Sequence, residues 1–411
     1  MKQAILFDRN FLKKINILFL QIIVFLLPIH QKIIPPFIGL WIISSIVRII
    51  VFKRKFTFNF SNVLLISFYL FLFFGVIWSQ NKSSAWFDLE VKMSLFIFPF
   101  LLSFLIYSFD EIINVIKSLI GGVFTAFLIL FSVSFINFYN TNDLDAFFYI
   151  NLSPYIHPTY LSFYINLSIF GLLLGINQIK YRLFSLKSIN VIFLVVLVFF
   201  NFLILSKIGV IVSILILGRF LIKWVFTNKK YLFGMAIIIL SFSLFLFSYK
   251  KSNYVNVRVN EFVEGLTTEN SQKTYIEGSS SMRFEVWRLS VELIKEKPIL
   301  GYGTGDVLDS LLKKYEKNGF EQGKLKRLNA HNQFLQVFIS VGVFGFVLFL
   351  FLFLISLKSG MQYFNYYQAG FIIMSIFFML PESILENQAG TIYFGLFFSL
   401  FSQKSLIKKS L

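Results

Sequence analysis

The stretch between Ser281 and Gly345 joins a charged segment to a long apolar run, and the rest of the chain is organised around it. It reads SMRFEVWRLSVELIKEKPILGYGTGD over residues 281–306 and, after a basic segment, NAHNQFLQVFISVGVFG over residues 329–345. The first segment holds two arginines and a glycine-rich turn, and the second holds one of the three histidines of the chain, directly before a run long enough to cross a bilayer. Any chemistry that this chain performs is therefore predicted in this stretch.

The composition is that of a membrane protein. Of the 411 residues, 57% are hydrophobic and only 14% are charged, and the mean hydropathy is +0.76. A soluble domain has about 25% charged residues, so this chain lacks the residues for a water-facing surface. Its apolar stretches are continuous, as in membrane helices, and do not alternate as in the strands of membrane barrels. The predicted fold class is an all-α, polytopic membrane helical bundle.

The apolar runs predict about twelve transmembrane helices. The least defined boundary lies at residues 206–208, where only a few residues separate two runs. The first run lacks a small-residue cleavage site, so it is predicted to remain as an anchor. The predicted spans are residues 15–29, 34–52, 62–79, 92–108, 113–138, 158–177, 188–206, 208–226, 231–249, 331–357, 364–381 and 389–402. The predicted division of the chain is a membrane bundle of nine spans (1–249), a large loop with helices (250–330) and a bundle of three spans (331–411).

The formal net charge of +18 comes from basic residues in short blocks between the apolar runs. An excess of Lys and Arg on one set of short connections predicts membrane orientation and does not indicate nucleic acid. Both termini are therefore predicted on the cytoplasmic side and the large loop on the opposite, extracytoplasmic side. The chain has no cysteine, which excludes disulfides and thiolate metal sites. The partners that this composition indicates are membrane lipids.

The charged segment contains two arginines with different predicted surroundings. Arg283 and Trp287 are four residues apart and would share one face of a helix. Arg288 lies at the spacing of surface charge pairs from Glu285 and Glu292. A guanidinium group is a planar fork of donors that suits phosphate oxygens. Arg283 is predicted to bind an anion, whereas surface pairing and anion binding both stay open for Arg288.

Two ionisable residues stand at predicted helix starts on the loop side of the membrane. Ionisable residues at membrane depth are costly, so each is a functional candidate. Lys207, in LILSKIG, is either a lysine that reaches from a helix end to the interface or a cation that faces an anionic head group. His331 lies in the first turn of the tenth span, where a neutral imidazole is favoured and could accept a proton from a hydroxyl. The alternative for His331 is a capping or hydrogen-bonding histidine.

Several neighbouring polar residues have two interpretations each. Asn332 could cap the helix or orient His331. His157, in SPYIHPTYLSFY, could line the same cavity or mark an ordinary helix start. Glu382 and Glu386, in LPESILENQAG, are four residues apart at a predicted helix end and could position a sugar or face water.

The glycine-rich segment GYGTG at residues 301–305 is not a nucleotide-binding loop. No Gly-Lys-Ser/Thr follows it and no strand precedes it, so it is predicted to form a tight turn that returns the loop to the membrane. No pair of histidines or carboxylates has the spacing of metal ligands. Neither a metal nor a cofactor is predicted.

The motifs in this region resemble those of the O-antigen ligase and polymerase family. They are Arg283-x-x-x-Trp287, PILGYGTGD, Ala330-His331-Asn332-x-x-Leu335 and Gly342-x-x-Gly345, with LILSKIG and ESILENQAG on either side. The resemblance extends over most of the chain in topology, and its specific motifs lie within residues 205–345. In LILSKIG the family usually has Ser-Arg, so the lysine keeps the charge but loses the bidentate geometry.

This resemblance implies a metal-independent, inverting glycosyltransferase of the membrane-embedded GT-C type. Its donor would be a glycan on undecaprenyl diphosphate, and its acceptor would be the lipid A-core, another glycan or a protein hydroxyl. The resemblance implies that His331 activates the acceptor hydroxyl and that Arg283 and Lys207 contact the diphosphate. Arg288 is a further candidate for the diphosphate, and Trp287, Asn332 and His157 are candidate supporting residues.

The predicted function is that of an O-antigen ligase in the bacterial inner membrane. The alternatives are an O-antigen or exopolysaccharide polymerase and a protein O-oligosaccharyltransferase, which use the same donor chemistry. A polysaccharide transporter is the competing class, and it would show related halves and broken helices near the bilayer midplane. Here the polar residues are concentrated on one predicted side of the membrane, in the large loop near the end of the chain, which favours an enzyme.

Overall fold

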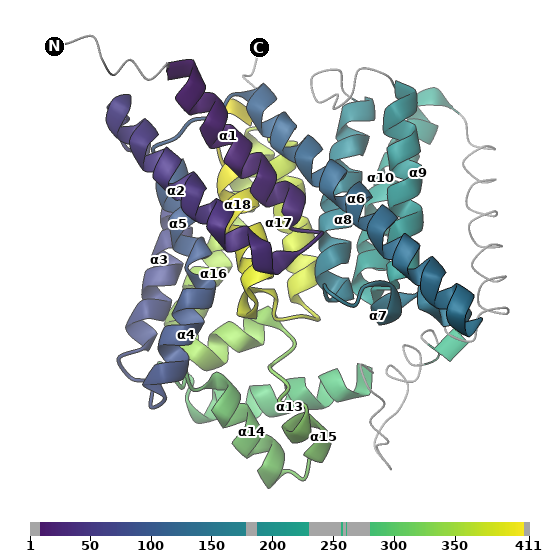
Figure 1. Ribbon diagram of the computed structural model, residues 1–411. Coiled ribbons are helices and arrows are strands. Elements are labelled where there is room, and N and C mark those ends of the chain that lie inside the picture. Colours follow the sequence, from purple (N-terminus) through teal and green to yellow (C-terminus); the bar gives the residue numbers. More distant parts are fainter. Residues whose placement is uncertain (1–8, 178–186, 230–255, 258–259, 261–279, 407–411) are drawn as a thin grey trace.

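The computed structural model describes residues 9–177, 187–229, 256–257, 260 and 280–406, which form a helical bundle (Figure 1). The helices before the loop are α1 (Arg9–Leu26), α2 (Ile34–Val51), α3 (Phe60–Gly75), α4 (Lys82–Lys92), α5 (Ser94–Leu102), α6 (Phe109–Thr141), α7 (Tyr149–Leu152), α8 (Pro158–Asn177), α9 (Lys187–Ile204) and α10 (Lys207–Asn228). The loop helices are α13 (Ser280–Glu296), α14 (Val307–Lys317) and α15 (Glu321–Leu325). The last helices are α16 (Gln333–Gln362), α17 (Tyr366–Met379), the 3-10 helix η4 (Ile384–Glu386) and α18 (Gln388–Phe401).

The predicted fold class is confirmed. Within the described residues, five helices are long and apolar enough to cross a membrane, and they lie in Gln31–Val51, Phe109–Thr141, Pro158–Gly175, Lys207–Asn228 and Gln333–Gln362. The elements α3, α9, α17 and α18 contain apolar helices that are shorter than these five. The other predicted spans overlap α1 and α5, while the predicted span 231–249 lies outside the described residues.

One predicted span differs from the helix that forms. The span predicted at residues 92–108 contains only α5, which ends at Leu102 and has Pro99 inside it. The preceding residues form α4, a separate helix of lower hydropathy. Proline has no N–H to donate and its ring crowds the preceding turn, which explains why a long straight helix does not form here.

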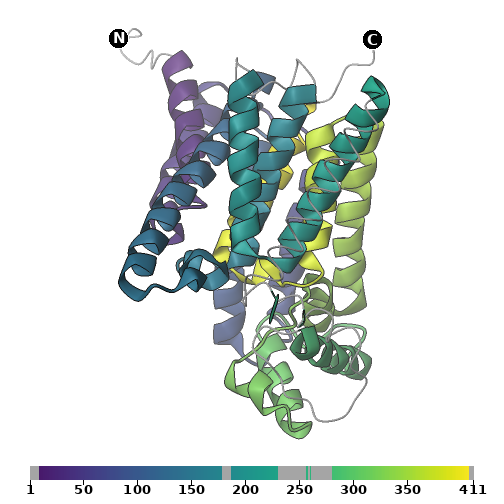
Figure 2. The same cartoon turned by 90° about the vertical axis from the view of Figure 1, so that its right-hand side faces the viewer.

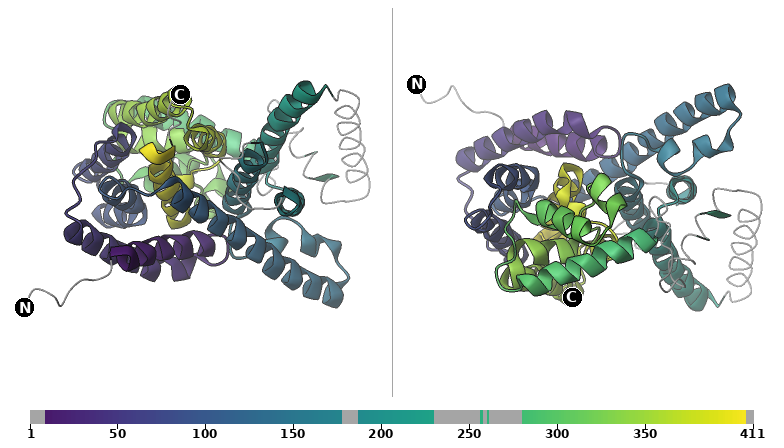
Figure 3. Two further views of the ribbon diagram at one scale, coloured as in Figure 1. Left: turned by 90° about the horizontal axis from the view of Figure 1, so that it is seen from above. Right: turned by 90° about the horizontal axis from the view of Figure 1, so that it is seen from below.

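Two helices form the centre of the bundle. Every residue of α18 from Ala389 to Phe401 is buried, and Figure 3 shows this helix enclosed by its neighbours. It packs against α3, α4, α5 and α17, while α8 packs against α6, α9, α10 and α17. The two central helices meet through aromatic rings, since the Phe163 ring lies 4.7 Å from that of Tyr393 and 4.5 Å from that of Phe378 in α17.

The loop helices cover one end of the bundle. The start of α1 and the end of α18 lie at the opposite end, as Figures 1 and 2 show. Helices α13 and α14 have a small core of their own, which also takes in Phe320 just before α15 and Ile339 of α16. The loop is therefore joined to the bundle through the first turns of α16.

The glycine-rich turn fits into a break in α16. The backbone of α16 is non-helical at Val341 and Gly342. There the carbonyl of Ile339 accepts a hydrogen bond from the N–H of Tyr302 at 2.8 Å, and that of Ser340 accepts one from Gly303 at 2.9 Å. The N–H groups that could have cradled a phosphate are thus used to dock the turn. This arrangement agrees with the predicted return of the loop to the membrane.

Gly342 is required at this break. Its φ is +64°, a conformation that side chains rarely adopt, and a Cβ would lie 2.1 Å from the carbonyl oxygen of Ile299. The absence of a side chain at Gly342 thus lets the backbone of the loop at Ile299 lie directly against α16.

Candidate functional site

His331 lies immediately before α16 in a constrained backbone conformation. Its φ is +42°, which costs a non-glycine residue on the order of 1–3 kcal/mol and persists only where the surroundings hold it. Its N–H donates to Oδ1 of Asn329 at 2.9 Å, and its carbonyl accepts from Nε1 of Trp287 in α13 at 3.1 Å. The Trp287 side chain thus fixes the backbone of the predicted base.

Asn332 is the N-cap of α16. Its side-chain oxygen accepts hydrogen bonds from the N–H groups of Phe334 at 2.9 Å and Leu335 at 3.1 Å. An N-cap satisfies N–H groups that have no partner within the helix. Of its two interpretations, the structure shows capping, and the cap fixes where α16 begins relative to His331.

His331 is paired with Glu382, which comes from the connection between α17 and η4. Nδ1 of His331 lies 3.4 Å from Oε1 of Glu382. The Glu382 side chain is 8% exposed, whereas that of His331 is 25% exposed and its Nδ1 is buried. The carboxylate therefore faces Nδ1 from the protein side and leaves the accessible edge of the imidazole to Nε2.

The charges around Glu382 identify further members of the site. Burial raises the pKa of Glu382, but the adjacent imidazole of His331 and the charges of His157 and Arg283 outweigh it, so its pKa is lowered from the ordinary value. Glu382 is thus a buried carboxylate that stays ionised at neutral pH. His331 lies against this carboxylate, and the charges of Arg283 and His157 also act on it.

Hydrogen bonds fix the connection that carries Glu382 against the start of α16. The N–H of Asn332 donates to Oγ of Ser383 at 3.2 Å, and the N–H of Leu385 donates to Oε1 of Gln333 at 2.7 Å. These bonds join the residues next to His331 to the residues next to Glu382.

The two arginines of α13 have different surroundings, as the helical spacing indicated. Arg288 forms ion pairs with Glu285 at 2.7 Å and Glu292 at 2.5 Å. Arg283 forms no ion pair within the described residues, and its charge acts on Glu382. Surface pairing is thus observed for Arg288, and its contact with a diphosphate stays a prediction.

Lys207 is the first residue of α10, and a buried polar network holds this helix start in place. Asn201 and Asn166 both donate to the carbonyl of Gly209 at 3.2 Å. A Cβ at Gly209 would lie 1.7 Å from Oγ of Ser162, so α10 begins in direct contact with α8. The Lys207 ammonium group is buried.

His157 lies just before α8, at the same end of the bundle. Its side chain is exposed, and its Nδ1 accepts a hydrogen bond from the N–H of Thr159 at 3.4 Å. This bond is of the kind expected at a helix start, while its charge also acts on Glu382. Both interpretations of His157 therefore have support.

Glu382 is the site residue that the sequence left undecided. It does not lie on a helix end facing water, because it precedes η4 and is buried. Its neighbour Glu386 also faces inward and contacts Lys92 of α4 at 2.8 Å. The sequence signal was the presence of two carboxylates beside a predicted span, but it could not show their partners.

No group of three or more metal-ligating side chains occurs within the part of the chain that the structure describes.

A family model described as O-antigen ligase matches residues 191–350. The matched segment contains Lys207, Arg283 and His331 and ends before Glu382. No curated protein matches the chain. Members of the matched family are glycosyltransferase-like enzymes, and a lipid-linked glycan is their substrate. The motifs predicted from the sequence and this match agree, and residues 191–350 are similar to the O-antigen ligase family.

Proposed function

We propose that this protein is an O-antigen ligase that transfers a glycan from undecaprenyl diphosphate to the lipid A-core of lipopolysaccharide. The observation that carries the proposal is the His331–Glu382 pair, which lies at one end of the bundle within reach of the charge of Arg283. The family match supports the donor class, because lipid-linked glycans are the substrates of this family.

His331 is the general base of the proposed reaction. Glu382 holds a proton on Nδ1 and leaves Nε2 as the acceptor, since a neutral imidazole has one donor and one acceptor nitrogen. Nε2 accepts the proton of the acceptor hydroxyl as its oxygen attacks the anomeric carbon of the donor sugar. The imidazolium that forms is stabilised by the Glu382 carboxylate, as in other histidine–carboxylate pairs.

The cations bind the leaving group. The bond between the anomeric carbon and the diphosphate oxygen breaks as the new glycosidic bond forms, and negative charge develops on the diphosphate. Arg283 offers paired donors to phosphate oxygens, and Lys207 at the start of α10 adds a second cation next to a helix N-terminus, which also attracts anions. A single displacement of this kind inverts the anomeric configuration.

The proposed reaction requires no cofactor, because the diphosphate already activates the donor. The substrate geometry fits a membrane enzyme, in which the polyprenyl tail stays in the bilayer and the reacting sugar lies under the loop. We place the loop helices and the site on the periplasmic side of the inner membrane and both termini in the cytoplasm, as the positive-inside pattern predicts.

The experiment is deletion of the gene followed by electrophoresis of lipopolysaccharide. Loss of a ligase leaves bare lipid A-core and accumulates lipid-linked polymer, and this is the expected result. Lipopolysaccharide with single repeats would identify a polymerase instead. Transfer by the purified protein without ATP separates an enzyme from a transporter, and a His331→Ala variant with full turnover would contradict the assigned base.

A further inference from the structure

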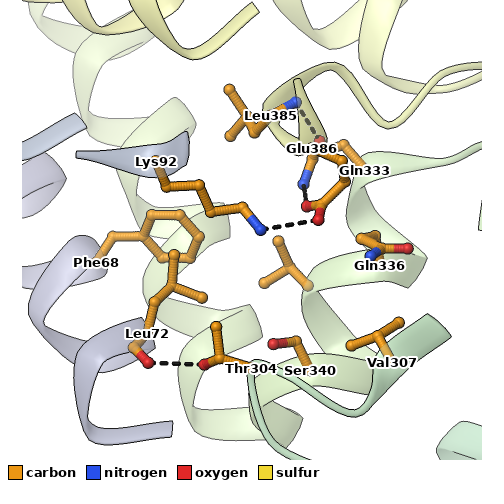
Figure 4. A pocket seen from close by; sticks show the side chains of 11 residues that line it. Phe68, Leu72, Lys92, Thr304, Val307, Gln333, Gln336, Ser340, Leu385 and Glu386 are labelled. Atoms are coloured by element: carbon orange, nitrogen blue, oxygen red, sulfur yellow. Dashed lines mark hydrogen bonds and ion pairs between the residues drawn. The ribbon is translucent and has the colours of Figure 1, made fainter. Parts of the chain in front are cut away.

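Lys92, the last residue of α4, is a buried lysine held by two carboxylates. Its Nζ lies 2.8 Å from Oε2 of Glu386, as Figure 4 shows, and 2.5 Å from Oδ2 of Asp88. The residue is only 5% exposed. A buried and doubly paired ammonium group is not accessible to a substrate, so its role lies in the groups that it holds.

Glu386 extends this contact to α16. Its Oε1 accepts a hydrogen bond from Nε2 of Gln333 at 3.3 Å, and Oε1 of Gln333 accepts one from the N–H of Leu385 at 2.7 Å. Figure 4 shows Lys92, Glu386 and Gln333 pointing toward one another from three separate elements. The network therefore joins α4, η4 and the first turn of α16.

Both ends of this network lie beside the reactive pair. Gln333 is two residues after His331, and Glu386 is four residues after Glu382. A displacement of Glu386 would therefore move the connection that carries Glu382 relative to the start of α16. Because proton transfer depends on such distances, a misplacement of about 1 Å can cost on the order of 100-fold in rate.

A stabilising role alone does not explain these charges. The free energy that is lost when two charges leave water offsets much of the attraction between them. Apolar replacements of buried ion pairs are therefore often neutral or stabilising for the fold. Here one lysine faces two carboxylates, beside a cavity of about 10 Å³ that has room for only about one water molecule. Such contacts specify the direction and distance of their partners.

We propose that Lys92 and Glu386 are positioning residues that set the distance between His331 and Glu382. Their contribution to catalysis rests on the proposed function of that pair, whereas their effect on the geometry of His331 does not.

The first experiment compares turnover per folded molecule in Lys92→Met and Glu386→Gln. We expect kcat to fall about 10- to 100-fold with KM for the lipid-linked donor nearly unchanged, because no substrate contact is removed. Lys92→Arg keeps the charge and should recover part of the loss. The matched control is Lys314→Met, which removes another lysine held by two carboxylates, but at the loop surface. Glu386→Gln keeps the pair between Lys92 and Asp88, so it tests the proposal even if Lys92→Met fails to fold.

The second experiment measures His331 directly and needs no transfer reaction. The chain has only three histidines, so His30→Gln with His157→Gln leaves His331 as the single imidazole. Its rate of modification by diethyl pyrocarbonate is followed against pH. We expect Lys92→Met and Glu386→Gln to change this profile several-fold and Lys314→Met to leave it unchanged.

The two experiments separate the two proposals. Folded Lys92 and Glu386 variants with wild-type kcat and an unchanged His331 profile would overturn the positioning role. A changed His331 profile together with full turnover by His331→Ala would instead refute the catalytic base and leave the positioning of His331 intact.

Discussion

Replacing Glu382 by glutamine is the most direct test of the reactive pair, because the side chain keeps its shape and loses only its charge. At 3.4 Å between Nδ1 and Oε1, and with an effective dielectric constant of about 20, a full imidazolium–carboxylate pair is worth about 5 kcal/mol. A half-developed charge in the transition state is worth about half of that. At about 1.4 kcal/mol for each factor of ten, kcat should fall between about 50-fold and a few thousand-fold.

The assay is glycan transfer by the purified protein in lipid nanodiscs, with kcat and KM for the lipid-linked donor measured separately. The control is Glu316→Gln, which removes an exposed carboxylate that pairs with Lys324 on the loop surface. The double variant His331→Ala with Glu382→Gln should be no slower than His331→Ala alone, because the carboxylate acts through the imidazole. A folded Glu382→Gln enzyme with kcat within twofold of the wild type would refute this reasoning.

Three further predictions use other parts of the structure. Arg283→Gln should lower the rate of glycan transfer on the order of 100-fold. Arg288→Gln should cause a loss at least tenfold smaller, because Arg288 already pairs with two glutamates. Equal losses for the two variants in the transfer assay would contradict this difference. Gly342→Ala should destabilise the protein by roughly 2–4 kcal/mol, seen as a lower melting temperature, because its Cβ would meet the Ile299 carbonyl; an unchanged melting temperature would show that the loop is not docked there. The folded-state pKa of Glu382 is lowered from 4.5, so the ionised carboxylate should stabilise the fold fully above pH 4.5 and lose this contribution as the pH falls through its folded-state pKa. Between pH 6 and pH 3 the melting temperature of Glu382→Gln should therefore fall less than that of the wild type.

The bundle could be predicted from the sequence because lipid imposes a simple rule, in which a long apolar run becomes a helix. The break in α16 could not be predicted in the same way. Val341 and Gly342 lie within a continuous apolar run, and the backbone that fills the break comes from Pro298 to Gly303. Hydropathy describes a segment by its own residues, whereas this break depends on a distant one.

The same limit applies to the site. His331 and Lys207 could be nominated because each is an ionisable residue next to an apolar run, where burial is costly. Arg283 could be nominated because its helical spacing separates it from the charge pairs of Arg288 and its guanidinium suits phosphate oxygens. Glu382 could not be assigned, because a carboxylate beside a helix faces water unless a partner holds it inside. Its partner His331 lies on the other side of α16 and α17 in the chain, and only the folded bundle brings the two together.

The position of Glu382 also has a consequence for how the site assembles. The segment that matches the family contains the histidine and the cations, but it ends at residue 350, before the carboxylate. Glu382 lies between α17 and α18, η4 leads directly into α18, and the Thr391 hydroxyl of α18 donates to the Val91 carbonyl of α4. The buried helix α18 thus follows directly on the connection that completes the site, so substitutions that disturb the packing of α18 should also disturb the reactive pair.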